Sequence, residues 1–274
     1  MNNQELYKLL DDSINELLGG EEGFDENISK YIKIHEDKTH FVPIKYRVLG
    51  GFLQSLNIKF GNFIEILLTK IINNQRIENF EIVKDISGKK NISLELEEDC
   101  EKEIDDYVNH PKEYSEKEFN KLLEIMFKNQ NNDKLTFTSK VFDIDLFLKN
   151  NSGEYTYVEL KYNDDHDTGK FMDINRKFLK TFAGLVRKFR IKNKDKINPI
   201  LYYFNQHSRY NNRYLKEHNH IMRSKELFDK LKLDITFEDI SNLLLQISEK
   251  LEEDFDKIRE KIFNKVKGRN KKLI

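Results

Sequence analysis

The sequence has a single cysteine, Cys100, and no tryptophan among its 274 residues. One cysteine excludes an internal disulfide and suits a reducing cytosol, so we expect a cytoplasmic protein. Cys100 lies in an acidic run, which is more typical of a bystander than of a nucleophile. The first residues lack a basic start followed by an apolar stretch, and no apolar run approaches the length of a membrane span. The composition therefore favours a globular protein with neither a signal peptide nor a membrane partner.

Internal repeats and glycine-serine linkers are also missing from the sequence. The length suffices for one large domain or two small ones, with a real hydrophobic core. We expect a single domain over residues 1–274. Its core would cover about residues 50–206, and a helical C-terminal part would cover about residues 207–274.

The formal net charge is only −1, with 47 Lys and Arg against 48 Asp and Glu. This near-neutral total hides a segregation along the chain. Residues 170–225 carry 15 Lys or Arg and three acids, so the remainder is strongly acidic. Such a split favours a local surface that faces a polyanion, although a solvated basic helix would explain part of it.

The spacing of apolar residues predicts the main helices and strands. Helices are expected near residues 6–18, 53–73, 116–127, 171–189 and 238–267. Thr236 and Asp239 resemble a capping box at the start of the last one. Short strands are expected at residues 80–83, 92–96 and 200–204, and the polar stretch 21–39 indicates irregular structure.

Residues 141–162, VFDIDLFLKNNSGEYTYVELKY, have the pattern of a β-hairpin. Apolar and aromatic residues alternate on both sides of Asn150–Gly153, which has the composition of a turn. The hairpin should pair antiparallel, and the strand–helix–strand segment after it should be parallel and right-handed. We therefore predict an α/β fold with a mixed central β-sheet flanked by helices.

Four charged side chains lie inside these apolar strands. Asp143 and Asp145 belong to the first strand, and Glu159 and Lys161 to the second. Alternate strand residues share a face, so all four groups could converge, and the carboxylates would then repel each other unless a cation neutralised them. Mg²⁺ is a suitable cation, and a nearby lysine can assist water or stabilise a phosphate, as phosphodiester hydrolysis requires. The alternative is a solvated strand face that carries these charges by chance.

Asp145…Glu159-Leu160-Lys161 resembles the PD-(D/E)XK nuclease motif, and the order of elements matches the αβββαβ core of that superfamily. The stretches 52–57 and 60–65, together with FDIDLFL and VELKY, resemble type II restriction endonucleases, in particular the TdeIII-like group. The resemblance covers about residues 50–206.

This resemblance implies roles for individual residues. Asp145 and Glu159 would be metal ligands together with the backbone carbonyl of Leu160, and Lys161 would position or activate water. Glu65 would support the metal's water shell or a second metal. Ile144 replaces the usual proline, which leaves Asp143 as a rival to the favoured Asp145, either as a secondary ligand or as a solvated residue.

Two segments could contact DNA. On the basic helix at 170–192, residues such as Lys170, Arg176 and Lys177 could face phosphates. The segment 205–214 follows a core strand and could read base edges, because Asn, Gln and Arg can form paired hydrogen bonds to bases. Its candidates are Gln206, Arg209, Asn211, Asn212 and Arg213, although a plain surface loop is equally compatible with this composition. The contiguous His218-Asn219-His220 is interpreted as surface residues, because it lacks further metal ligands.

These features together predict a Mg²⁺-dependent endonuclease of the restriction type that cuts double-stranded DNA at a short sequence. A palindromic site would require a homodimer, and the host would need a cognate DNA methyltransferase. Two alternatives stay open at this point: a DNA repair or junction-resolving nuclease, and a non-catalytic DNA-binding α/β protein.

Overall fold

The computed structural model describes residues 3–18, 20–36, 38–74, 80–110, 113–164, 168–205 and 213–267. Contacts along the chain divide it into two compact units, Met1–Phe63 with Ile235–Ile274, and Ile64–Asp234. The expected single nuclease domain, with its core at about residues 50–206, stays a prediction. No helix among the described residues is long and apolar enough to cross a membrane.

The first unit is helical. It contains α1 (Asn3–Leu18), α2 (Gly20–Glu36), the first part of α3 (Ile44–Asn74) and α8 (Phe237–Lys265). One buried apolar cluster of this unit contains Ile28, Ile32, Ile44, Val48, Phe52, Ile258, Ile262 and Val266.

Residues 21–39 correct one prediction in this unit. Most of this stretch is the helix α2, which is not the irregular segment that its polarity suggested. Ile28 and Ile32 are four residues apart and both are buried, so they lie on one face of the helix and pack into the core of the unit. The capping box at Thr236 and Asp239 is confirmed, with both reciprocal hydrogen bonds present.

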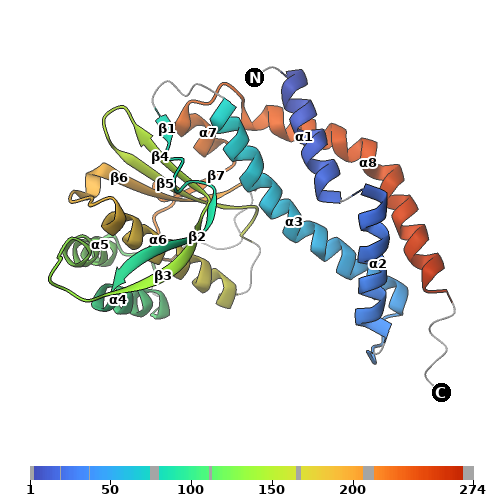
Figure 1. The fold of residues 1–274 in the computed structure, drawn as a ribbon, viewed down its shortest axis with the longest axis horizontal. Helices are drawn as coiled ribbons and strands as arrows, with labels where there is room; N and C mark the ends of the chain where they lie inside the picture. The colour runs from blue at the N-terminus through green and yellow to red at the C-terminus, as the bar shows by residue number, and fades with distance from the viewer. Residues whose placement is uncertain are drawn as a thin grey trace. The chain divides into compact units, whose positions relative to one another are not determined.

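The second unit contains a five-stranded mixed sheet in the order β1-β4-β5-β6-β7 (Figure 1). Its strands are β1 (Phe80–Ile82), β4 (Leu146–Asn150), β5 (Tyr155–Lys161), β6 (Ile197–Tyr203) and β7 (Ile221–Arg223). The pairs β1–β4 and β4–β5 are antiparallel, whereas β5–β6 and β6–β7 are parallel. A second, two-stranded antiparallel sheet pairs β2 (Lys89–Glu97) with β3 (Phe137–Ile144).

The helices of this unit are the second part of α3, α4 (Glu98–Asn109), α5 (Glu116–Gln130), α6 (Thr168–Lys188) and α7 (Lys225–Leu231), with a short 3-10 turn at Lys194–Lys196. The expected α/β fold with a mixed sheet flanked by helices is therefore confirmed. Both the antiparallel hairpin and the parallel strand–helix–strand segment are present. Helix α4 was not predicted, because its composition is mainly charged and only three of its side chains are buried.

The predicted hairpin consists of β4 and β5 around the turn Asn150–Gly153. The Asn150 amide donates to the Glu154 carbonyl at 2.8 Å, and Gly153 has a φ of +76°, which favours glycine. The first strand is not continuous, however. It ends at Ile144 in the two-stranded sheet and resumes at Leu146 in the five-stranded sheet. Alternation along one strand had predicted that Asp143 and Asp145 share a face. That prediction is wrong, because the strand is interrupted at Asp145.

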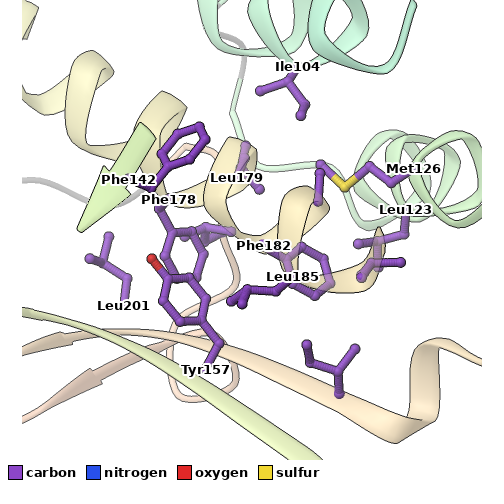
Figure 2. Packing of buried hydrophobic residues seen from close by; sticks show 14 of the residues in the cluster. Ile104, Leu123, Met126, Phe142, Tyr157, Phe178, Leu179, Phe182, Leu185 and Leu201 are labelled. Atoms are coloured by element: carbon purple, nitrogen blue, oxygen red, sulfur yellow. The ribbon is translucent and has the colours of Figure 1, made fainter. Parts of the chain in front are cut away.

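Helix α6 lies at the centre of the core of this unit. Figure 2 shows Phe178 above Tyr157, which comes from β5, and their rings stack at 5.4 Å between centroids. On another side of α6, side chains from α4 and α5 such as Ile104, Leu123 and Met126 belong to the same buried cluster. The helix is thus held by apolar contacts on several sides, which fixes the positions of its charged residues as well.

Gly184 provides a test of this packing. A Cβ added at this position of α6 would meet the Leu94 Cβ at 2.7 Å, too close for any real contact. We expect Gly184→Ala to lower the free energy of unfolding by about 1–3 kcal/mol, measured by urea denaturation. In the matched control Gly61→Ala the added methyl has nothing within 4 Å, so a gain of about 0.5–1 kcal/mol from helix propensity is expected. Equal stability of the two variants would contradict the close packing of α6 on β2.

Candidate active site

Asp145 lies where the chain passes from one sheet to the other. Its backbone carbonyl accepts a hydrogen bond from the Gly88 amide at 3.0 Å. Its carboxylate Oδ2 accepts from the backbone amide of Leu160 at 2.8 Å. The side chain is thereby fixed against β5, and Asp145 is almost completely buried.

Glu159 is the most buried acidic residue of the site, with 1% of its area exposed. Burial alone would raise the pKa of this carboxyl, but Lys161 and Lys177 outweigh that cost and hold the pKa below its usual value. Lys161 Nζ lies 2.8 Å and Lys177 Nζ 3.1 Å from Oε1, and the Tyr157 hydroxyl donates to Oε2 at 2.7 Å. Glu159 is therefore an ionised carboxylate that polar partners hold in one orientation.

Lys161 brings the oxygens of the site together. Its ammonium lies 2.8 Å from Glu159 Oε1, 2.7 Å from the carbonyl oxygen of Leu160 and 3.7 Å from Asp145 Oδ2. Three hard oxygens thus surround one positive group, and oxygens of this kind are the ligands that Mg²⁺ and similar ions prefer. The donor set consequently fits a divalent metal, with Asp145, Glu159 and the Leu160 carbonyl as the residues that would hold it.

Asp143 has a different environment. Its Oδ1 accepts a hydrogen bond from the Asn91 amide at 2.9 Å, beside an irregularity in the β2–β3 pairing. Asn91 has a φ of 57°, a left-handed conformation that asparagine tolerates better than most residues. Asp143 therefore satisfies a backbone donor in the two-stranded sheet, whereas Asp145 lies with Glu159 and Lys161.

Other metal ligands are not evident in the described part of the chain. Within it, no group of three or more His, Cys, Asp or Glu side chains is placed to hold a metal. Glu65 belongs to α3, but its side chain lies outside the described residues. Its role as a support for the metal's water shell or for a second metal stays a prediction.

Four basic side chains of α6 have acidic partners within the protein. Arg176 pairs with Asp105 at 3.1 Å and with Asp173, and Lys177 pairs with Glu159. Lys180 contacts Glu101 at 2.7 Å and Asp105 at 2.9 Å, and Arg187 pairs with Glu95 and Asp133. Lys170 is exposed near the start of the helix. The DNA contacts of Lys170, Arg176 and Lys177 stay predictions, and the ion pairs show that much of this charge also serves the fold.

The expected base-reading segment is only partly described. Gln206, Arg209, Asn211 and Asn212 lie outside the described residues, and Arg213 is exposed. His218 contacts Glu226, and His220 Nδ1 lies 3.0 Å from the Pro199 carbonyl oxygen. Both histidines therefore have protein partners.

Sequence reasoning missed two features near the site. Tyr157 precedes Glu159 by two residues on the same strand face, so strand alternation could have revealed it. Arg223 is in register with Tyr203, which is in register with Lys161. The guanidinium of Arg223 lies over the Tyr203 ring and 3.0 Å from the buried Asp164, at the ends of three parallel strands. No local pattern indicates this pair, because its members are far apart in the sequence.

The chain is similar over most of its length to known type II restriction enzymes. A family model described as "Type II restriction endonuclease, HinfI" matches residues 2–248. The type II restriction enzyme HinfI of Haemophilus influenzae is 39% identical over 251 residues, covering 90% of this chain and 92% of that protein. No solved structure matches the chain.

The chain is thus a type II restriction endonuclease, a site-specific deoxyribonuclease. More narrowly, it belongs to the HinfI family of these enzymes. Membership implies DNA as the substrate and a divalent metal ion as cofactor, and it excludes the non-catalytic alternative. The narrower TdeIII-like resemblance is not tested by these matches and stays a prediction.

The bond from Tyr157 to Glu159 can be tested directly. Burial is the main cause that raises the pKa of Tyr157 well above its usual value, so its hydroxyl keeps the proton that it donates to Glu159. We expect Tyr157→Phe to lower the free energy of unfolding by about 1–3 kcal/mol, because a buried acceptor loses its donor. Tyr155→Phe, which keeps the ring stacking on Phe147, is the matched control and should have a smaller effect. Equal unfolding midpoints in urea for Tyr157→Phe and the wild type would contradict a stabilising hydrogen bond from Tyr157 to Glu159.

Proposed function

We propose that Asp145, Glu159, Leu160 and Lys161 form the catalytic centre with which this endonuclease hydrolyses double-stranded DNA, with Mg²⁺ as the metal. The observation that carries this proposal is the convergence of three oxygens on the Lys161 ammonium, at distances from 2.7 to 3.7 Å. The centre has the composition of a PD-(D/E)XK site. When bound, Mg²⁺ would polarise the phosphate and lower the pKa of a coordinated water.

The residues divide this work between them. Asp145 and Glu159 supply negative oxygens, each held by a hydrogen bond from elsewhere in the protein. Lys161 Nζ is placed to orient the attacking water or to stabilise the negative charge that develops on the phosphate oxygens. Glu65 would act as an outer support of this centre, from α3.

DNA recognition would involve two further regions. The segment 205–214, with Gln206, Arg209, Asn211, Asn212 and Arg213, would contact base edges from the end of β6. Lys170, Arg176 and Lys177 of α6 would contact phosphates, in addition to their contacts within the protein. The segment 205–214 would thus recognise the DNA sequence, and α6 would position the DNA backbone.

The proposed biological setting follows from the enzyme class. A palindromic target has a two-fold axis, so a homodimer with the same symmetry would place one centre on each strand. The enzyme would act in the cytoplasm. A cognate DNA methyltransferase would protect the host's own sites as part of a restriction-modification system.

Alanine substitutions test the catalytic assignment. Asp145→Ala, Glu159→Ala and Lys161→Ala should each lower the rate of cleavage of supercoiled plasmid with Mg²⁺ by about 100-fold or more, because each removes a charge placed at the reacting phosphate. Asp143→Ala is the matched control, since its carboxylate bonds to Asn91 instead. It should retain activity within a few-fold, and a loss as severe as that of Asp145→Ala would refute the choice between the two aspartates. Circular dichroism would verify that all four variants are folded.

Sequencing of cleaved ends tests the proposed symmetry. We expect unmethylated DNA to be cut within one short sequence, at the same offset on both strands, because a homodimer presents two identical centres. Unmethylated and methylated copies of the same plasmid are the natural pair of substrates. Cuts at unequal offsets, or within a target that lacks two-fold symmetry, would contradict a symmetric homodimer.

A further inference from the structure

Lys177 differs from the other basic residues of α6 in its partner. Its ammonium lies 3.1 Å from Oε1 of Glu159, whereas Arg176, Lys180 and Arg187 pair with acids of α4, β2 and the neighbouring loops. No local sequence pattern links Lys177 to β5. The contact exists because Phe178, the next residue, stacks on Tyr157 and fixes the helix above the strand.

The two oxygens of Glu159 have distinct partners. Oε2 accepts from the Tyr157 hydroxyl, which is neutral and buried. Oε1 contacts both Lys161 and Lys177, at 2.8 and 3.1 Å. Oε1 is also the oxygen that shares the Lys161 ammonium with Asp145 and the Leu160 carbonyl, so it is the oxygen turned toward the metal ligands.

The formal charges of these four side chains sum to zero. Two carboxylates, Asp145 and Glu159, are matched by two ammonium groups, Lys161 and Lys177. A divalent cation at the same oxygens would add two positive charges beside both lysines, at a site where burial strengthens electrostatic interactions. Repulsion from the metal then makes the present position of at least one ammonium group unfavourable.

Exposure indicates which lysine can leave. The side chain of Lys177 is 39% exposed and that of Lys161 is 22% exposed. Lys161 also bonds to the Leu160 carbonyl, whereas Lys177 reaches Glu159 from the helix with the end of a flexible stem. Departure of Lys177 into solvent therefore disturbs less of the structure.

We propose that Lys177 is a displaceable counter-ion of Glu159, which holds the carboxylate in the metal-free enzyme and gives up Oε1 when a divalent metal binds. This role rests on the proposed catalytic centre. It makes Lys177 a positioning residue that lowers the metal affinity of the DNA-free enzyme. In the metal-free protein its ammonium offsets the charge of the buried Glu159 carboxylate.

Metal binding without DNA tests the proposal. The free Mn²⁺ signal in electron paramagnetic resonance would give the affinity for Mn²⁺ alone at about pH 8, where carboxylates are ionised. We expect Lys177→Met to bind Mn²⁺ roughly fivefold more tightly than wild type, since a competing, partly exposed ion pair is gone. Lys177→Arg keeps the charge and should restore near wild-type affinity. Lys188→Met, an exposed lysine of the same helix, controls for net charge and should change little.

A thermal-shift measurement gives a second readout. Without metal, Lys177→Met should melt at a lower temperature than wild type, and Mn²⁺ should raise its melting temperature by more than it raises that of wild type. Unchanged or weaker Mn²⁺ affinity in folded Lys177→Met would overturn the counter-ion role. Glu159→Gln separates the two proposals, because a loss of Mn²⁺ binding in this variant upholds the catalytic centre even if Lys177→Met behaves like wild type. Unchanged Mn²⁺ binding in Glu159→Gln would refute both.

Discussion

The buried carboxylate of Glu159 is the constraint on which the rest of the site depends. A charge withdrawn from water is tolerated only where other groups replace its hydration. Tyr157, Lys161 and Lys177 supply that replacement from one strand and one helix. The strand must therefore be central and the helix must be packed tightly on it, and both conditions are met by β5 and α6.

Asp145 shows how a change of sheet can direct an acidic side chain. A residue within a regular ladder has its direction set by the pleat, but Asp145 falls between β3 and β4 and belongs to neither. The Gly88 amide and the Leu160 amide fix its backbone and its side chain separately. The carboxylate can thus approach β5 in a way that an uninterrupted strand would not allow.

The hairpin, its turn and the antiparallel and parallel pairings could be predicted from the sequence because they follow local rules of alternation and turn composition. The proximity of Glu159 to Lys161 could be predicted for the same reason, since one strand carries both. The separation of Asp143 from Asp145 could not be predicted, because the strand break depends on long-range bonds to residues 83–91. The contact between Lys177 and Glu159 could not be predicted from the sequence either, since it depends on how α6 packs over β5.

Helix α2 shows that polar composition alone is a poor guide to irregular structure. A few buried side chains were enough to make a helix from a stretch that looked irregular, because tertiary packing outweighs composition. Helix α4 repeats this in the second unit, where an acidic surface covers three buried residues.

The ion pairs of α6 have a consequence for how the enzyme responds to ionic strength. Salt weakens protein–DNA association by competing for phosphates. In this protein, salt also acts on the fold, because Arg176, Lys180 and Arg187 attach the helix to its neighbours through charge. The Lys180–Glu101 pair is largely shielded from solvent and resists screening, whereas Asp133 and Glu95, which contact Arg187, are exposed and respond to it. The salt sensitivity of the enzyme therefore has two separate origins, one at the DNA and one along a single helix.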